Sequence, residues 1–140
     1  MHMDYLILAI NPGSTSTKVA IYYNNKLVKE KTLRHDVEAL EPFGGIIEQE
    51  DFRKEVILKF LEDHDYELKD IDVFVGRGGM MKPLKNGGTY LVTKDMLNDL
   101  RSGEYGYHAS NLGAILANGF AKQYKRPAYI VNPVCIDEFD

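Results

Sequence analysis

The pattern of apolar and polar positions over the first 33 residues predicts β-strands. Residues Asp4–Ile10 are mostly apolar and rich in strand-forming types, and this run stops at the turn-forming sequence 11–13. In Thr17–Tyr23 alternate residues point to opposite faces, and the two asparagines at 24–25 suit a tight hairpin turn. With a third strand over Lys26–Leu33, the pattern predicts an antiparallel meander of three strands.

From residue 51 onward, apolar residues recur at the three- and four-residue spacing of helices, with short strand-like runs between them. The predicted elements are a helix with Asp51 at its N-cap, a strand Ile71–Val75, an extended stretch Thr89–Val92, a short helix capped by Thr93 and ended by Gly103, a helix His108–Tyr124 and a strand Tyr129–Val131. Strands joined through helices lie parallel to one another. A meander followed by two such crossovers therefore predicts an α/β fold with a mixed sheet and flanking helices.

The composition is that of one ordinary globular domain. The 140 residues carry 17 basic and 21 acidic side chains, which gives a formal net charge of -4. Since no stretch concentrates Lys and Arg, binding to nucleic acid or to an anionic membrane is not expected. The longest apolar run, Leu6–Ile10, is far shorter than the roughly 20 residues of a membrane span, so a cytoplasmic protein is expected. Cys135 is the only cysteine, which excludes an internal disulfide and a thiolate metal cluster.

The turn between the first two predicted strands is a candidate phosphate-binding loop. Small residues allow backbone N–H groups to approach an anion, hydroxyl groups add further donors, and a lysine adds positive charge. The residues with these properties are Asn11, Gly13, Ser14, Thr15, Ser16, Thr17 and Lys18. The sequence is not a Walker A loop, because Lys18 enters a strand rather than a helix. A solvated hairpin would have the same composition, and from these residues alone the two interpretations are equally supported.

A second candidate is Arg77, which lies between glycines directly after a predicted strand. With Gly76, Gly78 and Gly79 as neighbours, its planar guanidinium group can reach a carboxylate or a phosphoryl group without crowding. The segment is not a dinucleotide-binding fingerprint, because Met81 occupies the place of the third glycine. A surface ion pair is the alternative interpretation of this arginine.

Two further groups of residues are ambiguous. His108, at the start of a predicted helix, can cap that helix or donate to a bound ligand. The last predicted strand is followed by Asn132 and then by the carboxylates of Asp137, Glu138 and Asp140. Carboxylates in this position can hold Mg²⁺, and they can equally form a solvated acidic stretch.

Taken together, five segments of the chain resemble the acyl kinases of the acetokinase family, and among these most closely the butyrate kinases. The segments are Ile10–Lys18, Val75–Gly79, Gly88–Tyr90, His108–Ala114 and Pro127–Val134, which leads into Asp137 and Glu138. The resemblance implies a ribonuclease H-like (actin-like ATPase) domain whose mixed five-stranded sheet has the order 3-2-1-4-5. It also implies that residues 1–140 are a single N-terminal domain and that a second, nucleotide-binding domain lies outside this chain.

The activity that this resemblance implies is reversible transfer of the γ-phosphoryl group of ATP to a short-chain fatty acid such as butyrate, with Mg²⁺. The candidate loop would face the nucleotide phosphates. The implied substrate contacts are Arg77, Gly78, Gly79 and His108, and the implied metal contacts are Asn11 and Asp137. The implied catalytic set is Arg77, Asn132 and Asp137, and Asn132 stands where acyl kinases carry an aspartate.

Three alternatives compete with this hypothesis. A nuclease on the same fold would need carboxylates on the first strand, where only Asp4 lies at the start and Asn11 at the end. A phosphate-binding or substrate-binding module without turnover would account for Asn132 in place of an aspartate. A related kinase for acetate, propionate or isobutyrate would differ only in its acyl pocket, where one methylene is worth roughly 1 to 3 kcal/mol. The resemblance also implies self-association into a homo-oligomer.

Overall fold

The computed structural model describes residues 4–77, 89–103 and 108–131. Its strands are β1 (Leu6–Pro12), β2 (Ser16–Tyr23), β3 (Lys26–Arg34), β4 (Val73–Arg77), β5 (Thr89–Leu91) and β6 (Ala128–Val131). Its helices are α1 (Val37–Leu40), α2 (Glu50–Asp63), α3 (Lys94–Ser102) and α4 (Leu112–Gln123), with short 3-10 helices η1 (Ile47–Gln49), η2 (Leu68–Asp70) and η3 (Ala109–Asn111). None of the helices described is both long enough and apolar enough to cross a bilayer.

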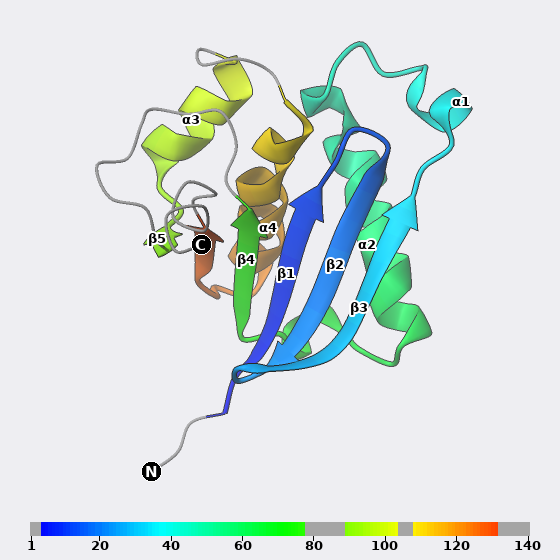
Figure 1. Cartoon of the computed structure of the whole chain (residues 1–140). Helices are drawn as coiled ribbons and strands as arrows, with labels where there is room; N and C mark the ends of the chain where they lie inside the picture. The colour runs from blue at the N-terminus through cyan, green and yellow to red at the C-terminus, as the bar shows by residue number, and fades with distance from the viewer. Residues whose placement is uncertain (1–3, 78–88, 104–107, 132–140) are drawn as a thin grey trace, which may run out of the picture.

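The strands form one mixed sheet of six in the order β3-β2-β1-β4-β6-β5 (Figure 1). As expected, β1, β2 and β3 form an antiparallel meander, and β4 and β6 run parallel to β1. The predicted order 3-2-1-4-5 is wrong by one strand: Tyr129–Val131 lies next to β4 as predicted, but β5 pairs antiparallel outside it. A strand of only 3 residues carries no period-two pattern of its own, and its place in the sheet depends on pairing with β6.

One face of the sheet is covered by α2 and α4, which lie behind it in Figure 1. The residues of β1 alternate accordingly, since Leu8 and Ile10 are fully buried in the core, whereas Ala9 between them is only half-buried. Within the core, Phe74 of β4 stacks on Phe120 of α4 with ring centroids 6.2 Å apart. Burial of such apolar side chains is the main source of stability. The arrangement leaves the opposite face of β1, β2 and β4 accessible.

Local capping signals explain where several elements begin or end. The hydroxyl of Thr93 accepts a hydrogen bond from a backbone N–H in the first turn of α3, and Gly103 ends this helix with a φ of 69°, both as predicted. Asn24 has a φ of 57° in the turn between β2 and β3, as a tight hairpin requires. The prediction of Asp51 as an N-cap is wrong. Because η1 runs directly into α2, Gln49 occupies the N-cap and Asp51 lies in the first turn.

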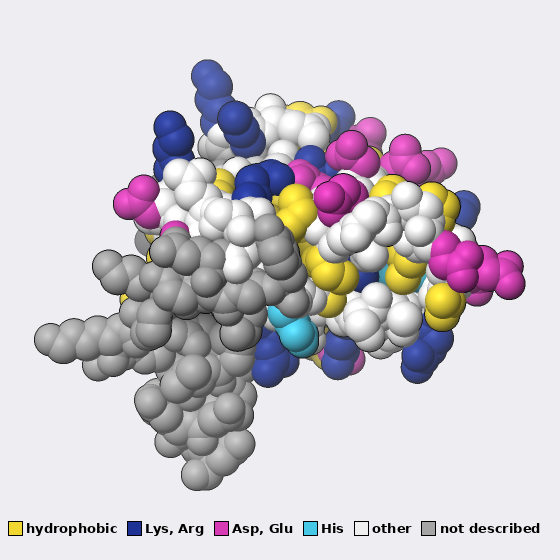
Figure 2. Space-filling model, turned by 90° about the horizontal axis from the view of Figure 1, so that it is seen from above, with side chains coloured by type: hydrophobic (Ala, Val, Ile, Leu, Met, Phe, Trp, Pro, Cys, Tyr) yellow, Lys and Arg dark blue, Asp and Glu magenta, His cyan; other side chains and the backbone are white. Residues whose placement is uncertain are grey.

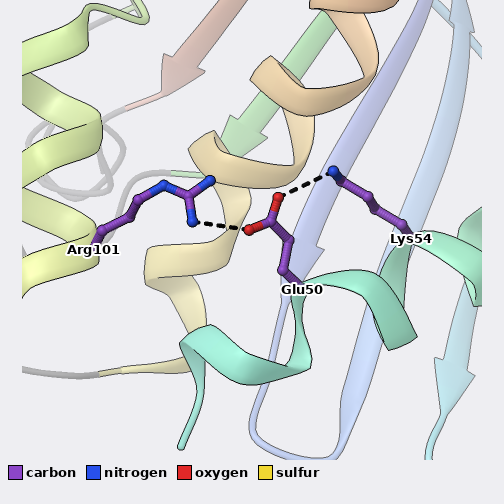
Figure 3. Close-up of polar contacts among 3 residues, drawn as sticks. All are labelled: Glu50, Lys54 and Arg101. Atoms are coloured by element: carbon purple, nitrogen blue, oxygen red, sulfur yellow. Dashed lines mark hydrogen bonds and ion pairs between the residues drawn. The ribbon is translucent and has the colours of Figure 1, made fainter.

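Helix α3 is attached to α2 through the carboxylate of Glu50 (Figure 3). One oxygen of Glu50 accepts a hydrogen bond from Arg101 of α3 at 2.9 Å, and the other lies 3.0 Å from the ammonium group of Lys54. Burial alone would raise the pKa of this carboxyl group, but the hydrogen bonds from the two cations hold the pKa below its ordinary value. A side chain at Gly119 of α4 would collide with the end of Lys54, so this glycine leaves room for the ion pair.

Candidate active site

Three predicted site residues lie in one row across the sheet, on the face that the helices leave open. Asn11 of β1 pairs with Lys18 of β2. Ile10 lies opposite Gly76 of β4, so the next residue of β4, Arg77, is beside Asn11. All three side chains line the same shallow hollow of about 270 Å³. The strand register therefore brings together residues from two separate sequence motifs.

The hollow combines apolar and charged side chains. Its apolar lining comes from neighbouring strands and consists of Ala9, Ile10, Ala20, Tyr22, Val75 and Val131. Its charged lining consists of Lys18, Glu30 and Arg77. Such a surface can hold a small anion that carries a short alkyl chain, with the chain on the apolar side chains and the anionic group beside Arg77.

Lys18 already has a partner within the protein. Its ammonium group lies 3.0 Å from the carboxylate of Glu30 on β3, and the two side chains are 47% and 39% exposed. Exposed ion pairs of this kind contribute about 1 kcal/mol at most. A bound anion can therefore compete with Glu30 for the lysine at small cost.

The segment rich in glycine, serine and threonine forms a tight turn between β1 and β2, which we call the 13–16 turn. The N–H of Gly13 donates to the carbonyl oxygen of Ser16 at 2.7 Å and closes it. Ser14 and Thr15 are exposed at its tip. No described residue accepts a hydrogen bond from the backbone N–H of Ser14 or Thr15. These donors are therefore available to the oxygen atoms of a ligand.

Arg53 of α2 holds the 13–16 turn from the interior. Its side chain is fully buried, and Nη1 donates to the carbonyl oxygen of Ser16 at 2.9 Å and to the hydroxyl of Thr17 at 3.2 Å. Nη2 donates to the carbonyl oxygen of Ser14 at 3.1 Å. Nη2 and Nε both donate to Oε1 of Gln49, at 2.9 and 3.1 Å. The contacts use all three nitrogens of the planar guanidinium group, a geometry that a lysine does not reproduce.

Thr17, a predicted phosphate donor, faces this interior. It is fully buried, and its hydroxyl lies 2.8 Å from Nε2 of His35, whose ring meets Phe52 edge-on at 5.3 Å. Burial, and then the nearby charge of Arg53, lower the pKa of His35, which favours the neutral ring. Burial also lowers the pKa of Arg53, which nevertheless stays charged at neutral pH. The Thr17 hydroxyl therefore ties the turn to the buried cluster instead of pointing to solvent.

Sequence patterns did not single out Arg53, although one signal was present. Arg53, Ile57 and Phe60 recur at the spacing of one helix face, and all three are buried. An arginine on the apolar face of a helix requires buried partners. Its partners in the turn are 37 and 39 residues away in the sequence, so spacing alone does not identify them.

Two glycines bring the start of α4 to the end of β4. A methyl group on Gly76 would overlap the carbonyl group of Gly113, and one on Gly113 would overlap the carbonyl oxygen of Arg77. The predicted helix His108–Tyr124 therefore begins close to Arg77, as η3 followed by α4. His108 caps η3, since its Nδ1 accepts a hydrogen bond from the N–H of Ser110 at 3.2 Å. Its ring is exposed, and the described lining of the hollow does not include it.

Figure 2 looks down on the end of the molecule where β1 and β4 finish. Hydrophobic side chains are exposed in the middle of the described part of this end, and side chains of Lys, Arg, Asp and Glu lie around them. The 13–16 turn follows β1 directly, so it belongs to the same end. In open α/β sheets, ligands bind beyond the carboxyl ends of the parallel strands. The row across the sheet and the turn therefore form one candidate site.

Four predicted site residues, Gly78, Gly79, Asn132 and Asp137, lie outside the described residues. Of the predicted metal contacts, only Asn11 is described. Within residues 4–77, 89–103 and 108–131, no group of 3 or more His, Cys, Asp or Glu side chains could hold a metal ion. Asn11 offers a single amide oxygen, whereas Mg²⁺ in nucleotide enzymes is held largely by phosphates, water and carboxylates. The described part of the site therefore fits phosphate groups better than it fits a metal.

Comparison with known proteins gives a consistent sequence relationship. No protein-family model matches the chain. Butyrate kinase 2 of Clostridium acetobutylicum is 50% identical over 138 residues, which are 99% of this chain and 38% of that protein. A probable butyrate kinase of Enterococcus faecalis is 53% identical over 132 residues, 94% of this chain and 36% of that protein. The chain thus spans less than two fifths of the length of these relatives.

Solved structures support the fold. Acetate kinase of Porphyromonas gingivalis aligns with a TM-score of 0.55 at 15% identity, covering 94% of this chain and 38% of that one. RuvC of T. thermophilus, in complex with a Holliday junction substrate, aligns with a TM-score of 0.50 at 11% identity. This alignment covers 98% of this chain and 69% of the RuvC chain. At such identities the likeness concerns the fold alone, and it agrees with the predicted α/β class. The sequence of the chain is similar to butyrate kinases over nearly all of its residues.

Proposed function

We propose that this chain is the N-terminal domain of a short-chain fatty-acid kinase, which transfers the γ-phosphoryl group of ATP reversibly to butyrate. The row of Lys18, Asn11 and Arg77 carries the proposal, because it gathers two cations and an amide at an apolar hollow. The 50% identity to a butyrate kinase supports the same assignment. β1 contains no Asp or Glu, which argues against a metal-dependent nuclease on this fold.

The described residues have separate tasks in this proposal. Arg77 binds the carboxylate of the acid through its planar fork and stabilises negative charge on the phosphoryl group during transfer. The exposed Ser14 and Thr15 hold phosphate oxygens through their N–H and hydroxyl groups, and Lys18 adds positive charge. The apolar side chains of the hollow hold the alkyl chain of the acid. Positioning and charge stabilisation dominate phosphoryl transfer, so these tasks are the ones the chemistry needs.

ATP and Mg²⁺ are the proposed cofactors. When bound, Mg²⁺ would supply positive charge that offsets the negative charge of the phosphate groups. We assign Asn11 and Asp137 as its contacts on this chain, and Arg77, Asn132 and Asp137 as the catalytic set. Because the amide of Asn132 carries no charge, the proposal assigns the negative charge near the metal to Asp137. His108, Gly78 and Gly79 complete the proposed binding site for the fatty acid.

The proposal extends to the whole protein. Residues 1–140 would form one half of a cleft, and a second domain outside this chain would bind the nucleoside of ATP. This division agrees with the 38% of a relative's length that the chain spans. We further propose a cytoplasmic homo-oligomer that binds neither nucleic acid nor membranes.

Synthesis of ATP from ADP and butyryl phosphate tests this function. The native-length gene product is mixed with both substrates and Mg²⁺, and ATP is measured with luciferase. We expect ATP to form with the natural sequence and with Arg126→Ala, which removes an exposed arginine away from the site, and not with Arg77→Ala. A folded protein that forms no ATP would contradict the proposal and favour a binding module without turnover.

A further inference from the structure

The positive charge of Arg53 is buried without an acidic partner in the described part of the chain. All its hydrogen bonds end on neutral oxygens, which are the carbonyl groups of Ser14 and Ser16, the hydroxyl of Thr17 and the amide of Gln49. The ion pairs found among the described residues do not include it. A buried charge is costly unless something compensates it. No described carboxylate forms an ion pair with the guanidinium group, so its positive charge acts on the surface turn that it binds.

The carbonyl group that Arg53 binds fixes the direction of a neighbouring N–H group. In a trans peptide unit, the C=O of one residue and the N–H of the next point in opposite directions, and no described peptide bond is cis. The carbonyl oxygen of Ser14 points inward to Nη2 of Arg53 at 3.1 Å, so the N–H of Thr15 points outward. The carbonyl oxygen of Thr15 is held in turn by the N–H of His35 at 2.8 Å. Two successive peptide groups of the exposed turn are therefore anchored from inside.

We propose that Arg53 is a positioning residue for phosphate, acting through the 13–16 turn without touching the ligand. It directs the N–H of Thr15 toward an oligophosphate chain and places a permanent positive charge behind it. Arginine suits both tasks, because its fork binds two carbonyl groups at once and its charge does not titrate. The inference rests on the proposed function for the nature of the anion, and it assigns to Arg53 part of that anion's affinity.

A purely architectural role for Arg53 makes a different prediction. If Arg53 only stabilised the fold, its replacement would lower the fraction of folded molecules, and those that remain folded would bind phosphate normally. If Arg53 positions the turn, the affinity of the folded molecules themselves falls. The two roles are thus separated by an affinity measured on protein that is shown to be folded.

The experiment is calorimetric titration of the native-length gene product with tripolyphosphate. We compare the natural sequence with Arg53→Met, which removes the charge and the fork, and with Arg53→Lys, which keeps the charge. Thermal unfolding first verifies that each variant is folded. We expect Arg53→Met to weaken binding by about tenfold or more, and Arg53→Lys to recover part of this loss. In turnover, Arg53→Met is expected to raise KM for ATP while KM for butyrate stays unchanged.

The matched control is Lys59→Met, which removes one positive charge from the same helix. The Lys59 side chain is 78% exposed and pairs only loosely with Asp63, at 3.8 Å, so we expect its removal to leave the affinity within twofold. Folded Arg53→Met protein that binds tripolyphosphate as tightly as the natural sequence would overturn the inference. An equal loss of tripolyphosphate affinity in Arg53→Lys and Arg53→Met would overturn the inference that the charge of Arg53 contributes to binding. If Arg53→Met does not fold, unchanged affinity in Arg53→Lys would overturn the positioning role.

The proposed function is measured separately in the same preparations. A natural protein that binds tripolyphosphate in an Arg53-dependent way but forms no acyl phosphate would refute the kinase and support the positioning role. Acyl phosphate formation with unchanged affinity in Arg53→Met would refute the positioning role alone. Natural protein that does not bind tripolyphosphate at all would contradict this role of the turn.

Discussion

The contact between the start of α4 and the end of β4 depends on Gly113, and this dependence can be tested within a single helix. Alanine at Gly113 would place a methyl group against the backbone carbonyl of Arg77. Alanine at Gly119, six positions later in the same helix, would meet only the flexible end of Lys54. The two substitutions are chemically identical and differ in whether the neighbour can move away.

The magnitudes follow from these neighbours. Both substitutions gain about 1 kcal/mol of helix propensity. In Gly119→Ala, Lys54 must move, and the protein loses at most the stability that a partly exposed ion pair contributes, about 1 kcal/mol. Gly113→Ala costs about 1 to 3 kcal/mol or more, because backbone atoms can separate only if the helix shifts away from the sheet. We therefore expect Gly113→Ala to be about 1 to 2 kcal/mol less stable than Gly119→Ala, or about 4 to 8 °C lower in Tm at about 4 °C per kcal/mol.

Thermal unfolding followed by circular dichroism measures this difference. A helix that shifts away from β4 also displaces Arg77, so Gly113→Ala is expected to lose turnover in the native-length protein as well. Gly44→Ala serves as a further control, since a methyl group there meets nothing within 4 Å. Equal Tm values for the Gly113 and Gly119 variants would refute the close packing of α4 on β4.

Three further predictions concern the site and its surroundings. Arg77→Ala is expected to lower acyl phosphate formation by about 10²-fold or more while Tm stays unchanged, and unaltered turnover would remove the role assigned to this arginine. Because the folded pKa of His35 lies below its unfolded value of about 6.5, its contribution to stability is complete above about pH 6.5 and is lost as pH falls through the folded pKa. Urea unfolding is expected to show that the free energy of unfolding falls between about pH 8 and 5. This fall is expected to be smaller in His35→Gln and unchanged in the control His64→Gln. The isolated 140 residues are expected to bind ATP poorly, since they span only 38% of the length of the butyrate kinase that they match. Micromolar affinity by calorimetry would contradict the proposed division of the cleft between two domains.

Local patterns predicted the kinds of elements because each depends on neighbours within a few residues. The turn at Asn24, the cap at Thr93 and the end at Gly103 follow from side-chain and backbone preferences that act locally. The extended stretch that forms β5 was predicted, but its place at the edge of the sheet and the N-cap at Gln49 were not, since the first depends on a partner strand and the second on a preceding 3-10 turn. Pairing with β6 determines where β5 lies in the sheet, and the continuity of η1 with α2 places the N-cap at Gln49.

The sequence indicated exposed residues of the candidate site but not its buried ones. Glycines and hydroxyl residues next to the cations Lys18 and Arg77 have the chemistry of an anion-binding site, which the sequence alone indicates. Their arrangement in one row depends on strand register, which the hydrophobic pattern and the short turn specify together. The sequence does not connect Arg53 or His35 with the turn, because each binds it across a long sequence separation. Arg53 reaches the turn from α2, and His35 reaches it from the end of β3.

The most direct test of the central claim is hydroxylamine trapping of acyl phosphate from ATP and Mg²⁺ by the native-length gene product. Straight and branched acids of two to five carbons are compared, because acyl kinases differ in the shape of the acyl pocket. We expect trapped product that is strongest with butyrate or isobutyrate and absent without ATP. No product with any acid, from protein that is shown to be folded, would contradict the assignment as a fatty-acid kinase.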